Sequence, residues 1–77
     1  AERTSATEAR LSWNSQNDAM GYCIRLGIAP DKLYNSILVY GQNDYTVTFL
    51  NKETEKYYFA VDSFNESGIT KGSINEF

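Results

Sequence analysis

The stretch YYFAVDSFNESGIT, from Tyr57 to Thr70, decides the fold of this chain. Large apolar side chains occupy alternate positions in its first half, at Tyr57, Phe59 and Val61. A period of two residues places these side chains on one face of a β-strand and the intervening ones, among them Asp62, on the other face. Asn65 and Gly68 then give a turn signal. We therefore predict a half-buried strand followed by a hairpin, with Asp62 pointing to water.

Similar alternation predicts five further strands. They are expected at residues 8–14, 21–27, 36–40, 45–50 and 69–74. Turn residues separate these runs, and no stretch shows the period of an amphipathic helix. Trp13 falls on the inward side of the first run and is expected in the core. Six short strands at regular spacing favour an all-β sandwich of the Greek-key kind, although strand propensity alone leaves a barrel open.

Composition limits the classes of function. The chain has 77 residues and a formal net charge of −3, and 14% of its residues are aromatic. This length predicts a single domain, with aromatic rings supplying much of a small core. The lysines are spread singly among acidic residues, so we expect no nucleic-acid partner. No run approaches the roughly 20 consecutive apolar residues of a membrane span, so we expect none.

Few side chains could support catalysis. The sequence has no histidine, the commonest general base near neutral pH. Glycoside cleavage would need two carboxyl groups about 5–9.5 Å apart across a cleft. Asp62 is predicted to face water, and Glu53 and Glu55 fall on a turn, so we expect no such pair. We predict no catalytic residue, no metal site and no cofactor. Cys23, the single cysteine, lies on the outward side of its run and is interpreted as an inert thiol.

A set of short motifs between residues 9 and 74 resembles the fibronectin type III domain. The motifs are Leu11 with Trp13, Gly21-Tyr22-x-Ile24, Leu50, Tyr57-x-Phe59-x-Val61 and Asn65-x-x-Gly68. The resemblance implies an immunoglobulin-like Greek-key β-sandwich in which the Tyr57 hydroxyl returns to the backbone a few residues earlier. Too few residues precede Trp13 for a full first strand, so strand A is expected to be short or missing.

Two longer stretches, IRLGIAPDKLYNSILVYG and YYFAVDSFNESGITKG, resemble a narrower group. They are similar to the fibronectin-type modules of bacterial extracellular glycoside hydrolases, including family 43 enzymes of the xylosidase and arabinofuranosidase type. The resemblance implies that residues 1–77 form one accessory module of a larger secreted, cell-surface or periplasmic protein, with any export signal upstream of Ala1. Its expected partner is the catalytic domain of the same polypeptide, which it would pack on or position.

The alternative is a carbohydrate-binding module. Aromatic rings on a protein surface can stack on the apolar faces of sugar rings, and polysaccharide is then the partner. The candidate ligand-binding residues are Tyr34, Tyr58 and Phe64. The competing interpretation of the same rings is that they contact a neighbouring domain, since exposed apolar patches often mark partner surfaces.

Overall fold

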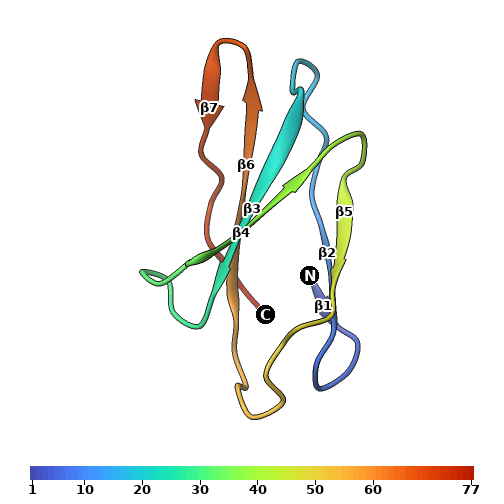
Figure 1. The fold of residues 1–77 in the computed structure, drawn as a ribbon, viewed down its shortest axis with the longest axis vertical. Coiled ribbons are helices and arrows are strands. Elements are labelled where there is room, and N and C mark those ends of the chain that lie inside the picture. The colour runs from blue at the N-terminus through green and yellow to red at the C-terminus, as the bar shows by residue number, and fades with distance from the viewer.

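The computed structural model describes residues 1–77 and consists of β-strands alone, arranged as two antiparallel sheets (Figure 1). The smaller sheet has the order β1-β2-β5, with β1 at Glu2–Arg3, β2 at Ala9–Ser12 and β5 at Asp44–Val47. The larger sheet has the order β4-β3-β6-β7, formed by β4 (Asn35–Val39), β3 (Gly21–Gly27), β6 (Tyr58–Asn65) and β7 (Gly68–Thr70). A last strand, β8 (Asn75–Glu76), also pairs with β6. The all-β prediction is confirmed. The structure holds no helix that could serve as a membrane span.

The core lies between the two sheets and follows the predicted alternation. Its nine buried members are Ala9, Leu11, Ile24, Leu26, Val39, Val47, Leu50, Tyr57 and Phe59. The largest fully buried side chains are aliphatic, and Trp13 is only partly buried where it packs against them. Its ring meets Tyr22 edge-to-face at 5.5 Å between centroids. Trp13 therefore faces inward as predicted, but it borders the core instead of filling its centre.

Tyr57 fixes the turn between β5 and β6. Its ring is buried, and its hydroxyl oxygen accepts a hydrogen bond of 2.7 Å from the Asn51 backbone N–H, six residues earlier. This bond was predicted. The Arg3 guanidinium lies over the same ring at 5.3 Å and donates to four backbone carbonyls of nearby turns, those of Ala6, Asn51, Thr54 and Glu55. Tyr22 repeats the bond at the other end of the fold, accepting from the Gln16 N–H at 2.8 Å.

The C-terminal strand is interrupted by a bulge. Between Ser63 and Phe59, β6 advances four residues, while its partner advances five, from Thr70 to Asn75. One extra residue is the definition of a β-bulge. Gly72 lies in this segment, where a Cβ atom would sit 2.1 Å from the Val61 carbonyl oxygen, so only glycine allows the close approach. A single strand over 69–74 was predicted. The pairing instead breaks at the bulge and resumes as far as Phe77, whose N–H and carbonyl both bond Tyr57.

We expect Tyr57→Phe to lower the free energy of unfolding by about 1–2 kcal/mol, because it removes the hydroxyl that satisfies the Asn51 N–H. Urea unfolding followed by far-UV circular dichroism measures this change. Tyr34→Phe is the matched control, since Tyr34 is 81% exposed and should tolerate the same change. Equal stability of the two variants would show that the corner bond contributes nothing.

Candidate functional site

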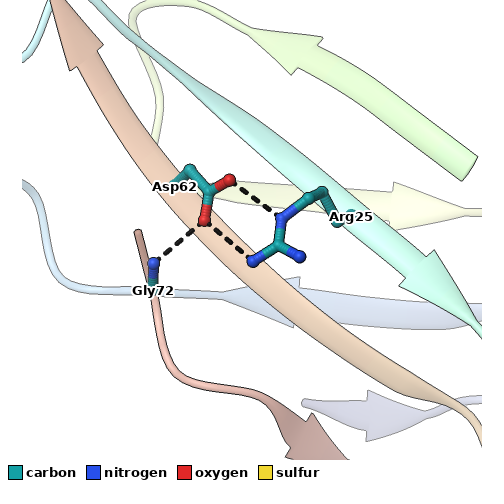
Figure 2. Close-up of polar contacts among 3 residues, drawn as sticks. All are labelled: Arg25, Asp62 and Gly72. Carbon is teal, nitrogen blue, oxygen red and sulfur yellow. Dashed lines mark hydrogen bonds and ion pairs between the residues drawn. The ribbon is translucent and has the colours of Figure 1, made fainter. Parts of the chain in front are cut away.

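Asp62 is buried, contrary to the prediction that it points to water. It lies on the outer face of β6 but is only 4% exposed. Its two carboxylate oxygens accept hydrogen bonds from Arg25 Nε at 2.8 Å, Arg25 Nη2 at 3.1 Å and the Gly72 N–H at 2.9 Å (Figure 2). Arg25 reaches it diagonally from β3, because Cys23 is the residue directly opposite Asp62. The two-residue period correctly places Asp62 on the outer face of β6. The Arg25 side chain and the bulge at Gly72 cover that face, so Asp62 is not in water.

The pKa of Asp62 reflects two opposing effects. Burial by itself raises the pKa, because it disfavours the charged carboxylate. The hydrogen bonds from Arg25 and Gly72 and the attraction of the cations outweigh burial, so the pKa lies below its ordinary value. The carboxylate is thus held in its charged form, and both of its oxygens accept hydrogen bonds. It acts as a clamp that joins β3, β6 and the C-terminal bulge.

No other arrangement of reactive groups suggests catalysis. Nowhere do three or more Cys, Asp or Glu side chains gather in a way that could hold a metal ion. Glu53 and Glu55 are exposed on the turn before β6, and no second carboxylate contacts Asp62. Cys23 is a partly buried, unpaired thiol on the outer face of β3.

The three predicted ligand-binding aromatics do not come together. Tyr58 and Phe64 lie near opposite ends of β6, and the six residue steps between them span about 20 Å. Tyr58 donates its hydroxyl hydrogen to Glu76 Oε1 at 3.0 Å, and this hydrogen bond raises the tyrosine pKa. Tyr34 precedes β4 and is exposed. The structure thus gives no single platform formed by Tyr34, Tyr58 and Phe64.

The half-buried Phe64 belongs to a different group of side chains, on the outer face of the larger sheet. Its ring meets Tyr40 edge-to-face at 5.8 Å, and both rings lie over Gly21, where a Cβ atom would be within 3 Å of each. Ile69 is directly opposite Phe64 on β7, and Leu38 lies two residues before Tyr40 on the same face. We call Leu38, Tyr40, Phe64 and Ile69 the outer-face row. Its members come from β4 and the residue that follows it, from β6 and from β7, and two of their rings cover Gly21 of β3.

An open groove of about 580 Å³ separates the end of β2 from the C-terminal strand. Ala1, Ser12 and Trp13 line one side, and residues of the bulge and β8, including Lys71 and Glu76, line the other. Trp13 Nε1 is buried and has no hydrogen-bond partner, the only buried side-chain polar atom in that state. Sequence patterns do not predict this groove, because its walls come from segments near the two ends of the chain.

No protein-family model matches this chain, and no curated protein matches its sequence. The features that sequence patterns missed are the Asp62 clamp, the outer-face row and the Trp13 groove. Of these, only the outer-face row could have been found from the sequence, because Leu38, Tyr40 and Phe64 share the outward phase of their alternating runs.

We expect Arg25→Gln to destabilise the fold by about 3 kcal/mol, because it leaves the Asp62 carboxylate buried without its cation. This is the lower end of the range for breaking a buried pair, since 25% of the Arg25 side chain contacts water. Arg10→Gln is the matched control. It breaks the exposed pair with Asp44 and should leave the urea midpoint within error of the parent chain. Equal losses in the two variants would contradict the role of Asp62 as a clamp.

Acid should weaken the fold through Asp62. Its pKa is lower in the folded chain than in the unfolded one, so the unfolded chain binds more protons in acid. The contribution of this group is present above the unfolded carboxyl pKa of about 4 and is lost as the pH falls through the folded value. Urea unfolding at pH 7 and pH 3 should therefore show a smaller difference for Asp62→Asn than for the parent chain. Parallel pH profiles would refute this account.

Proposed function

We propose that residues 1–77 form a fibronectin type III-like module with an immunoglobulin-like Greek-key topology and a short strand A. Three observations support this proposal. β2 and β5 share one sheet while β3, β6 and β7 share the other, the division of B and E from C, F and G in immunoglobulin-like sandwiches. Tyr57 immediately precedes β6 and makes the corner bond. β1 has only two residues.

The proposed role is that of a non-catalytic accessory module of a secreted or surface bacterial glycoside hydrolase, packing on the catalytic domain of the same polypeptide. The outer-face row is the observation that carries the packing role. Leu38, Tyr40 and Ile69 are each at least 59% exposed, and the partly buried Phe64 lies between Tyr40, whose ring it contacts, and Ile69, which is directly opposite it. Contiguous exposed apolar side chains of this kind mark contact surfaces, and contacts between domains of one chain are typically modest in area.

The positions of the two chain ends favour a module that packs on its neighbour over one that acts as a spacer. The domain is 39 Å along its longest axis, but Ala1 and Glu76 line the same groove. Chain entering and leaving at these residues would not use that length as a spacer. A module held near the middle of its long axis, where both termini lie (Figure 1), and by its outer face acts instead as a brace.

The carbohydrate-binding alternative has less support. The two rings in contact, Tyr40 and Phe64, stand 86° apart and offer no common plane for a sugar ring. Tyr34 and Tyr58 are distant from them along the fold. Retention of the 77-residue chain on xylan or arabinan columns, lost on Tyr58→Ala, would nevertheless reverse this preference.

Antibodies against residues 1–77 can test the accessory role by immunoprecipitation from the host. The captured polypeptide should exceed 8.7 kDa and should hydrolyse aryl xylosides or arabinofuranosides. Capture of an 8.7 kDa product alone, or of a larger product without hydrolase activity, would refute the proposal.

The packing face is tested in the same full-length enzyme. The double variant Leu38→Ser/Ile69→Ser should lower the temperature at which hydrolase activity is lost. The matched control is Ile28→Ser, which changes a side chain that is also 60% exposed but lies at the opposite end of β3. Equal inactivation temperatures for these variants would exclude the outer-face row as the packing face.

A further inference from the structure

Alternate residues of β4 point their backbone groups away from the larger sheet. β4 pairs with β3 alone, so one of its sides has no neighbouring strand. Tyr57 and Phe77 exchange both of their backbone hydrogen bonds, which directs the odd-numbered residues of β6 towards β8 and the even-numbered ones towards β3. The registers of β6 with β3 and of β3 with β4 carry this alternation to the edge. The N–H and carbonyl groups of Ser36 and Leu38 therefore point outward, and no hydrogen bond within the chain engages them.

This edge lacks the features that usually keep sheet edges from pairing, which are charged side chains, proline and bulges. The opposite edge of the larger sheet has the bulge at Gly72, and β5 in the smaller sheet carries Asp44, which is paired with Arg10. β4 reads Asn-Ser-Ile-Leu-Val from residue 35 to residue 39, with no charge, no proline and a regular register. Its length of five residues is the one limit on pairing, so the edge can form only a few bonds with another strand.

The exposed side chains beside this edge are arranged symmetrically about Ile37. Tyr34 precedes it by three residues and Tyr40 follows it by three. Both tyrosines share the outward phase of Leu38, and they are 81% and 59% exposed. Two identical strands paired antiparallel about Ile37 therefore match each tyrosine of one copy with a tyrosine of the other, as a two-fold axis requires.

We propose that the free edge of β4 is a dimerisation site for a second copy of this chain, paired antiparallel about Ile37. In this register Ser36 lies opposite Leu38 of the second copy, and the two residues exchange both main-chain hydrogen bonds. The two-fold axis repeats this pair, so every free group of the edge is satisfied. Continuing the register by one residue at each end places Tyr34 opposite Tyr40 of the second copy, again twice, and aromatic pairs across strands are stabilising. A second copy is the occupant that brings a matching tyrosine to both ends.

This contact is separate from the packing face. Edge pairing lies in the plane of the larger sheet and uses its backbone, while the side chains of the outer-face row stand on the face of the sheet. The dimer therefore goes beyond the accessory role, because the module would join two polypeptides as well as pack on one of them. The 77-residue chain carries the whole edge, so the inference does not depend on the proposed function.

Sedimentation equilibrium of the 77-residue chain tests the dimer. Because the edge offers few bonds, the contact is smaller than a standard protein interface and the dimer should be weak. We expect the average mass to rise from 8.7 kDa towards twice that value as the concentration increases from about 10 μM to about 1 mM. A constant mass over this range would overturn the site. Growth beyond two copies would also contradict it, since two-fold pairing is closed.

Amide hydrogen exchange measured by NMR shows whether the dimer uses this edge. Exchange at the N–H groups of Ser36 and Leu38 should slow in the concentrated sample, in proportion to the fraction of dimer, because these groups then bond to the second copy. The N–H groups of Ile37 and Val39 point to β3 and are the internal controls, which should change less. A dimer that leaves exchange at Ser36 and Leu38 unchanged would lie on another surface and would overturn the assignment.

Tyr34→Ala tests the register. It should raise the dissociation constant of the dimer about ten-fold, because the symmetric contact loses two aromatic pairs. Phe49→Ala is the matched control, since it removes another exposed ring, 52% exposed, from the segment after β5. Equal dissociation constants for the two variants would refute pairing about Ile37.

Ser36→Pro tests the backbone bonds. It removes an N–H group of the free edge and leaves the bonds from β4 to β3 in place, so it should abolish the dimer. Should this variant fail to fold by circular dichroism, Tyr34→Ala still decides between the outcomes. Loss of the dimer in Ile69→Ser, with Tyr34→Ala unaffected, would assign the dimer to the outer-face row instead. Because these tests use the 77-residue chain alone, their failure leaves the immunoprecipitation test of the accessory role standing.

Discussion

The buried ring of Tyr57 is the contact on which the two sheets depend. Its hydroxyl ties the ring to the backbone of Asn51, at the end of the segment that leaves the smaller sheet. Arg3 covers the ring from the first strand, and Phe77 stacks on it at 6.0 Å from the last. One side chain thus joins β1, the β5–β6 turn and the C-terminal residue. In a chain with no disulfide and a small core, such a junction replaces the constraint that a covalent bridge would supply.

This junction also explains why both ends of the chain lie near each other. β1 is too short to hold its place by ladder bonds alone, and the Arg3 guanidinium supplies the missing contacts through four carbonyls. Phe77 is held by two backbone bonds to Tyr57 and by its edge-to-face contact with Phe59. Both ends are therefore fixed at the same part of the fold, near the middle of its long axis (Figure 1).

Sequence reasoning succeeded where structure follows from local alternation. The inward faces of β2, β3 and β6 were predicted because strand geometry fixes which side each residue faces, whereas the Tyr57 corner bond was implied by the resemblance to fibronectin type III domains. It failed for Asp62, since facing outward is not the same as facing water. Whether an outer-face carboxylate is covered depends on Arg25 of another strand and on a bulge at Gly72. Arg3 and Phe77 were also missed. Their contacts lie far away in sequence, and neither belongs to an alternating run long enough to reveal a strand.

The unpaired edges of the two sheets are a second constraint on this structure. Unpaired edges invite pairing with other chains, and proteins blunt them with short strands, bulges or charged residues. Here the C-terminal edge is broken by the bulge, and the outer strands β4 and β5 have only five and four residues. The pairing of β1 with β2 covers only Ala9 and Arg10, so the rest of β2, next to the partly buried Trp13, has a paired neighbour on its β5 side alone.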